Sequence, residues 1–156
     1  MAAQIQKHIG NLLDVESGIL VHGCNALGVM GSGVALGVKK KFPNVYGAYR
    51  EAFLDRELRV GRIFPVQVSR EENGAPKLVV VNAITQEYYG TDRRHVDYDG
   101  LKRCFKDIAV FANAHGIKDI HFPLIGCGLA GGEWSVVAPI IEETLDGLNA
   151  HLWVLE

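Results

Sequence analysis

A strand pattern, a glycine-rich turn and the start of a helix follow one another in Leu20-Val21-His22-Gly23-Cys24-Asn25-Ala26-Leu27-Gly28-Val29-Met30-Gly31-Ser32-Gly33-Val34-Ala35. The glycines at 28, 31 and 33 allow positive φ and leave no Cβ between backbone and ligand. The start of a helix offers unpaired N–H groups, which favour an anion. Residues 25–34, the first glycine loop, are therefore predicted to bind phosphate, with a glycine turn that holds no ligand as the alternative. This is no Walker A loop, because Val34-Ala35 stands where that motif needs a lysine and a hydroxyl.

The same order of strand, glycines and helix returns in Pro123-Leu124-Ile125-Gly126-Cys127-Gly128-Leu129-Ala130-Gly131-Gly132-Glu133-Trp134. Residues 126–131 match the dinucleotide pattern G-x-G-x-x-G, and Asp146 lies at the distance where that fold has a ribose-binding acid. Only one helix and one strand can follow, which argues against a nicotinamide dehydrogenase with two βαβ halves. Two such loops in one small domain instead suggest that each grips one side of a diphosphate. Residues 125–133 are called the second glycine loop.

The rest of the chain alternates short β-branched runs with helical periods, which predicts an α/β domain with a largely parallel sheet. An Asn73-Gly74 pair between two strand candidates predicts a hairpin, so the sheet should be mixed. The strand candidates are Gln4–Ile9, Gly18–Cys24, Arg62–Ser69, Leu78–Ala83, Asp119–Leu124 and His151–Leu155.

Four helices are expected from apolar spacing. The first ends before Pro43, the second is expected to be capped by Asn44, and the third ends near Gly116. The fourth carries the clearest stripe: Trp134, Val137, Ile141, Leu145 and Leu148. The longest irregular stretch, Thr85 to Asp97, contains Tyr88-Tyr89-Gly90 and Arg93-Arg94, either exposed loop residues or groups that close over a ligand.

Length and charge narrow the classes of protein. The 156 residues suit one domain over 1–156, with monomer as the default state. The formal net charge of −2 gives no general field for nucleic acid or an anionic membrane. Three unpaired cysteines, no signal pattern and no apolar run of roughly 18 residues predict a soluble, cytoplasmic protein.

Val21-His22-Gly23-Cys24-Asn25 with Gly31-Ser32-Gly33-Val34-Ala35, and the distant Ile125-Gly126-Cys127-Gly128-Leu129, closely resemble the two ligand loops of the macrodomain family. The resemblance covers nearly the whole chain, including Gly10-Asn11-Leu12-Leu13, where the family usually has Gly-Asp. It implies a three-layer α/β/α fold around a mixed sheet and a site at strand ends that binds ADP-ribose. No metal or other cofactor is implied.

The resemblance also assigns roles to residues. Asn11 would accept a hydrogen bond from the adenine amino group, where the family has an acid, and Leu12 would lie beside the adenine. Asn25 would contact the distal ribose; a turn-stabilising amide is the alternative for this residue. The phosphates would be bound by residues of both loops: Gly31, Ser32, Gly33, Val34, Ile125, Gly126, Cys127, Gly128, Leu129, Ala130 and Gly131.

Within the family, the chain is most similar to the branch of terminal ADP-ribose glycohydrolase and the ADP-ribose 1″-phosphate phosphatases. The lysine and aspartate of the glycohydrolases are replaced by Gln86 and Ala130. The phosphatases share a histidine before the first loop, which makes His22 the candidate catalytic residue, either proton donor or activator of water. A histidine satisfied by hydrogen bonds at a strand end is the alternative. Cys127 is better explained as a small packed thiol than as a nucleophile.

Three functions follow from the resemblance. The first is hydrolysis of ADP-ribose 1″-phosphate to ADP-ribose and phosphate. The second is a reader that binds ADP-ribose, or protein that carries it, without turnover. The third is a hydrolase that removes ADP-ribose from protein or nucleic acid. The remaining histidines are His8, His95, His115, His121 and His151, and they lack metal-ligand spacing.

Overall fold

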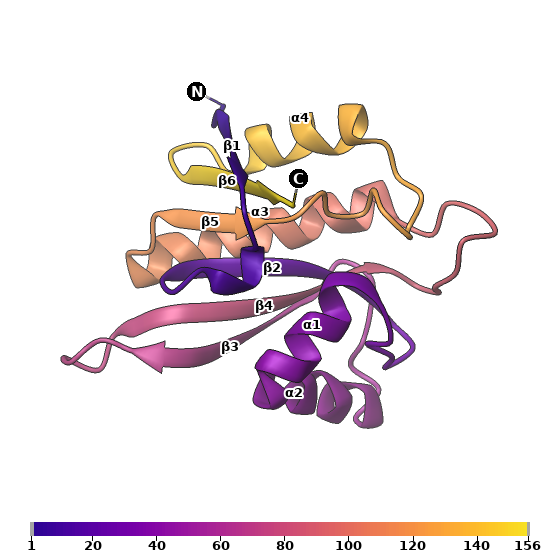
Figure 1. Ribbon diagram of the computed structural model, residues 1–156, viewed down its shortest axis with the longest axis horizontal. Helices are drawn as coiled ribbons and strands as arrows, with labels where there is room; N and C mark the ends of the chain where they lie inside the picture. The colour runs from indigo at the N-terminus through magenta and orange to yellow at the C-terminus, as the bar shows by residue number, and fades with distance from the viewer. Residues whose placement is uncertain (1, 156) are drawn as a thin grey trace.

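The fold is seen in a computed structural model, which describes residues 2–155. One six-stranded sheet lies between two helical layers (Figure 1). The strands are β1 (Ile5–Ile9), β2 (Gly18–Asn25), β3 (Ile63–Arg70), β4 (Pro76–Gln86), β5 (Asp119–Phe122) and β6 (Asn149–Val154). The helices are η1 (Leu12–Asp14), α1 (Gly33–Lys41), α2 (Pro43–Leu54), α3 (Tyr98–His115) and α4 (Trp134–Thr144).

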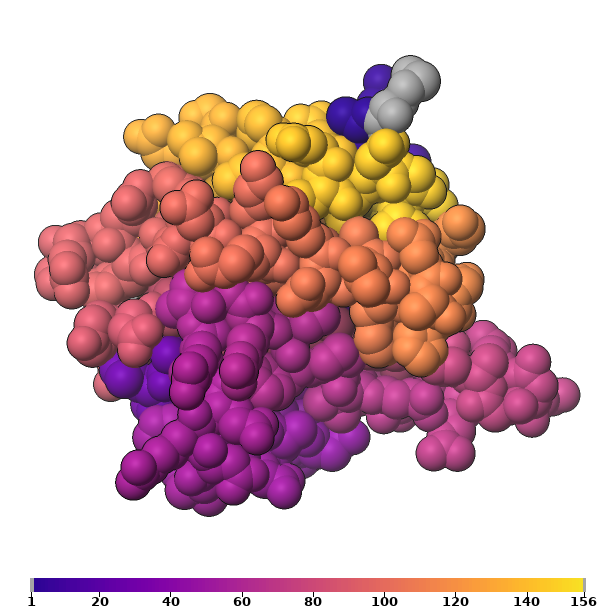
Figure 2. Space-filling view, turned by 180° about the vertical axis from the view of Figure 1, so that it is seen from behind, coloured from indigo at the N-terminus to yellow at the C-terminus, as the bar shows by residue number. Residues whose placement is uncertain are grey.

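The sheet has the order β1-β6-β5-β2-β4-β3. Five strands are parallel to their neighbours, and only β3 runs antiparallel, against β4. All six predicted strands and the hairpin at Asn73-Gly74 are confirmed, and the hairpin projects from the body of the molecule (Figure 2).

Two apolar cores lie on the two faces of the sheet, because side chains alternate along each strand. Ile19 and Val21 of β2 pack in the core that includes Leu101 and Ile141, from α3 and α4. Leu20, between them, faces the other way and joins a cluster that holds residues of α1 and α2. The expected three-layer α/β/α arrangement around a mixed sheet is therefore confirmed.

Two details of the predicted helices are wrong. Asn44 does not cap α2: Phe42 is the capping residue, and Pro43 occupies the first turn, where its missing N–H is no loss. The fourth helix ends at Thr144, before two residues of its predicted stripe, yet Leu145 and Leu148 remain in the core beyond the helix end. Gly116 ends α3 with a φ of 67°, as expected.

The topology brings three loops to one edge of the sheet. β2, β4 and β5 are parallel, so their carboxyl ends share an edge, and the segments that follow them lie together at the right of Figure 1. These segments are the two glycine loops and the long loop after Gln86, so the fold places all three at one site.

Within residues 2–155, no helix is long and apolar enough to span a bilayer.

The start of β2 provides a test of the packing between β2 and β5. A Cβ on Gly18 (φ 94°) would lie 2.6 Å from the backbone oxygen of Asp119, whereas one on Gly74 (φ 88°) would meet no atom within 4 Å. We expect Gly18→Ala to lower the free energy of unfolding by roughly 2–4 kcal/mol, since strain and a clash add, and Gly74→Ala by about 1 kcal/mol. Urea denaturation measures both, and equal losses would contradict this account.

A candidate ligand site between two glycine loops

The first glycine loop is shaped by the side chain of Asn25, at the end of β2. Its Oδ1 accepts hydrogen bonds from the Leu27 amide (3.0 Å) and the Tyr49 hydroxyl (2.8 Å), while its Nδ2 donates to the Val29 carbonyl (2.9 Å). These bonds occupy both polar atoms of the amide, which is only 9% exposed. The structure thus gives Asn25 a turn-stabilising role, and contact with a ribose stays a prediction.

Helix α2 packs against the same loop through two side chains. The Arg50 guanidinium donates to the carbonyl of Gly28 (3.0 Å) and lies 5.0 Å from the centre of the Phe53 ring. A Cβ on Gly28, whose φ is 79°, would come within 2.7 Å of both side chains. A glycine is therefore required here by its backbone angle and by its neighbours.

The second glycine loop is closed by its own backbone and joined to the long loop. Gly132 N–H donates to the Gly126 carbonyl (2.8 Å), and the Ala130 carbonyl accepts from the amides of His95 (2.8 Å) and Val96 (3.2 Å). The second glycine loop and the end of the long loop thus form one unit.

The second glycine loop lies against the first loop near the surface and against strand β2 at a deeper level. Near the surface, a Cβ on Gly33 would lie 4.0 Å from Leu129 Cδ1. Deeper, a Cβ on Gly23 would lie 3.3 Å from Ile125 Cγ1 and 2.9 Å from the Thr85 hydroxyl. Gly33 and Leu129, two of the predicted phosphate-binding residues, are thereby brought together.

Both loops keep amide donors available. Within residues 2–155, no hydrogen bond engages the backbone N–H groups of Gly31 to Val34, or those of Gly128 to Ala130. Gly31 to Val34 are exposed and include the first turn of α1, where the helix dipole favours negative charge. An anion between the loops would therefore find donors on both sides.

Asn11 and Leu12 lie beside α1, the helix that follows the first loop. Asn11 Oδ1 accepts from the Leu13 amide (2.9 Å) and so caps η1, while Leu12 is 5% exposed. A Cβ on Gly37 of α1 would come within 2.6 Å of Leu13 Cδ1, so η1 packs directly on this helix. The adenine contacts expected of Asn11 and Leu12 stay predictions.

His22 lies away from the loops, on the sheet face that α2 covers. Its ring is fully buried, and Nε2 lies 2.6 Å from Asn82 Oδ1, while Asn82 donates to the Val45 carbonyl (3.2 Å). Burial lowers the pKa of His22 to about 4, partly opposed by the bond to Asn82, so the ring is neutral near pH 7. This geometry matches a histidine satisfied by hydrogen bonds. Contact with a substrate stays a prediction, and the burial of the ring argues against it.

Few reactive side chains lie at the meeting point of the loops. Gln86 donates to the Tyr88 carbonyl (2.7 Å), and Cys127 is a half-buried thiol whose pKa is raised by burial. Residues 2–155 contain no group of three histidine, cysteine, aspartate or glutamate side chains arranged to hold a metal ion.

Sequence reasoning missed two groups of residues. Tyr49 and Phe53 contact the first glycine loop, and this position depends on how α2 packs. His95, next to the second glycine loop, has its ring 2.9 Å from Asp92 Oδ1, a pairing across a loop that no regular spacing predicts.

The buried His22 predicts a pH-dependent stability. Because its pKa is lower in the folded protein than in the unfolded chain, the unfolded chain takes up the proton first, and stability falls as the pH drops from about 6.5 to about 4. We expect a loss of about 3 kcal/mol from this residue over that range. His22→Gln should remove this part of the loss. The contribution of His121, whose pKa burial also lowers to about 4, should remain in both proteins. Denaturation at several pH values gives the free energy of unfolding as a function of pH. Equal slopes for the wild type and His22→Gln would show that His22 does not cause this loss.

Comparison with known proteins agrees with this architecture. The family model "Macro domain" matches residues 21–141. The chain is 32% identical over 148 residues to a DNA ADP-ribosyl glycohydrolase of Thermus aquaticus, covering 94% of this chain but only 39% of that protein. It is 25% identical over 142 residues to an ADP-ribose 1″-phosphate phosphatase of Candida albicans, covering 88% and 87% of the two chains. The solved macrodomain of Thermus aquaticus DarG superposes with a TM-score of 0.80 at 30% identity, over 99% of both chains. The chain therefore belongs to the macrodomain family.

Proposed function

We propose that this domain binds ADP-ribose between its glycine loops and hydrolyses a derivative of ADP-ribose that carries a substituent on the distal ribose. The observation that carries the proposal is the meeting of two sets of unengaged backbone N–H groups, near Gly33 and Leu129. A diphosphate placed there would receive donors from both loops without a cationic side chain. η1 beside α1 would take the adenine, and the end of β2 the distal ribose.

The first candidate substrate is ADP-ribose 1″-phosphate. The family includes phosphatases of this compound that are similar to the chain over most of its length, such as the Candida albicans protein. Gln86 and Ala130 stand where the glycohydrolases of the branch have a lysine and an aspartate, which disfavours a lysine-based mechanism. Loop N–H groups would stabilise the charge on the phosphoryl oxygens while water attacks phosphorus and the P–O bond to the ribose oxygen breaks. The proton that water loses would pass to the departing ribose oxygen, which gives ADP-ribose and phosphate. His22, within β2, enters this scheme as a positioning residue, because its ring is buried.

The second candidate is ADP-ribose linked to nucleic acid. It is favoured by the 32% identity to the Thermus aquaticus DNA ADP-ribosyl glycohydrolase, although the chain spans well under half of that protein. ADP-ribosylated protein is a further candidate substrate, and binding without turnover is the outcome expected of a reader.

One experiment separates these candidates. The protein is incubated with ADP-ribose 1″-phosphate, an ADP-ribosylated oligonucleotide and an ADP-ribosylated protein, and the products are identified by mass spectrometry. We expect free phosphate and ADP-ribose from the first compound, because loop N–H groups and water suffice for that step. Release of ADP-ribose from the oligonucleotide alone would select the second candidate. Binding without any product would contradict the hydrolase proposal.

The loops also predict a charge effect on binding. Gly33→Glu places a carboxylate among the proposed phosphate donors, and we expect it to weaken ADP-ribose binding roughly 100-fold or more through repulsion. Gly33→Gln is the matched control, since it adds a side chain of similar size at the same positive φ (59°) without the charge. Calorimetry measures both dissociation constants. An unchanged value for Gly33→Glu would place the diphosphate elsewhere.

A further inference from the structure

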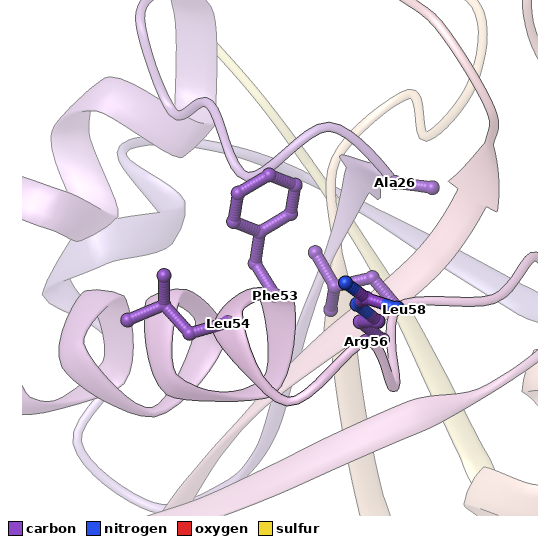
Figure 3. A pocket seen from close by; sticks show the side chains of 5 residues that line it. All are labelled: Ala26, Phe53, Leu54, Arg56 and Leu58. Carbon is purple, nitrogen blue, oxygen red and sulfur yellow. The ribbon is translucent and has the colours of Figure 1, made fainter.

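A cavity of about 390 Å³ lies beside the start of the first glycine loop. Figure 3 shows the Phe53 ring on one side of it and the side chains of Arg56 and Leu58 on the other. Ala26 and Leu54 complete the lining. The wall therefore combines an aromatic ring, aliphatic groups and one cationic side chain.

The cavity lies at the distal-ribose end of the proposed site. Ala26 directly follows Asn25, and its N–H donates to the carbonyl of Glu87 (3.2 Å), just past the end of β4. η1 marks the opposite end, beside α1. The proposed ligand would thus run from adenine at η1, past the phosphates, to a ribose at Asn25, and the cavity is lined by the residue that follows Asn25.

Phe53 is held in place and coupled to the loop. The Arg50 guanidinium lies 5.0 Å from the ring centre, and the ring also lies against the backbone of Gly28. A planar group that enters the cavity would therefore meet a fixed aromatic ring that is also part of the support of the first glycine loop.

Arg56 has an unusual backbone conformation. It is the only residue other than glycine with a positive φ (60°) within residues 2–155, a conformation that L side chains rarely adopt. Its side chain is exposed, and in the same part of the chain no ion pair or hydrogen bond engages its guanidinium. The Arg56 N–H donates to the Phe53 carbonyl (3.0 Å) and the Glu57 N–H to the Ala52 carbonyl (2.8 Å), so this angle is that of a left-handed cap ending α2. The unengaged guanidinium, held at a fixed helix end, is the feature that suits a ligand.

The surroundings add charge and aromatic surface. Exposed Arg59 and Arg62 follow Arg56 in the segment that joins α2 to β3. Tyr88 and Tyr89, just after Glu87, are 52% and 55% exposed. Arginines for phosphate and aromatic rings for bases are the combination that binds single-stranded nucleic acid, even though the whole chain is slightly acidic.

We propose that this cavity is a nucleotide subsite: it takes the base next to the distal ribose against Phe53 and Leu58, with the strand's phosphate on Arg56. The inference rests on the proposed function, because the cavity is placed relative to a bound ADP-ribose, and it favours nucleic acid as the substrate class. An acidic peptide would use the arginines but would leave the aromatic ring and the cavity without a planar partner.

The test measures two dissociation constants for the full chain: one for ADP-ribose by calorimetry, and one for a mixed-sequence single-stranded decamer by fluorescence anisotropy at about 50 mM salt. Arg56→Gly removes the guanidinium and suits a positive φ, so the variant is expected to fold. We expect it to weaken decamer binding roughly tenfold and to leave ADP-ribose binding within about twofold of wild type. Leu54→Glu, at a side chain that is 70% exposed, should also weaken decamer binding. Arg70→Ala, an exposed arginine at the end of β3, is the matched control and should change neither constant.

Two results would overturn the subsite while the proposed function stands: ADP-ribose binds but the decamer does not, or Arg56→Gly binds the decamer as tightly as Arg70→Ala. Binding of a glutamate-rich peptide that depends on Arg56 and is tighter than decamer binding would also overturn it. Failure of the wild-type chain to bind ADP-ribose would overturn the proposed function, and the subsite with it, and is seen in the calorimetry alone.

Discussion

The hydrogen bond from the Tyr49 hydroxyl to the Asn25 side chain joins helix α2 to the first glycine loop, and much of the candidate site depends on it. Tyr49 is fully buried, and burial raises the pKa of its hydroxyl, so the group stays a protonated donor. Because Asn25 Oδ1 also holds the Leu27 amide, one helix position determines where the loop leaves the sheet. The glycines then present backbone donors from a loop whose shape is held by hydrogen bonds of its own.

The architecture could be predicted because its signals are local. Each strand shows as a β-branched run, and the antiparallel hairpin is indicated by Asn73-Gly74. The two glycine loops can be recognised in the sequence from their glycines alone. Parallel strands then bring the loops at their carboxyl ends to the same edge of the sheet. Chain order and strand direction therefore give the place of the site.

The chemistry of individual residues was harder to predict, because it depends on which face of a strand a side chain occupies. His22 is three residues before Asn25 in the same strand, yet it faces α2 and is bonded to Asn82. A sequence motif that places a histidine just before a glycine loop does not show whether the side chain faces the loop or the buried side of the sheet. The same limit applies to Arg56, whose backbone angle follows from how the chain leaves α2 and has no signature in composition.

The β3–β4 hairpin has a practical consequence. Its turn lies at the amino end of β4, whereas the glycine loops lie at the carboxyl ends of β2 and β5. β4 is 11 residues long, which places the turn on the order of 35 Å from the far end of that strand. A Cβ on Gly74 meets no atom within 4 Å, so the turn has open space around it. An affinity tag or fluorophore inserted there would report on the protein from the end of the molecule remote from the glycine loops.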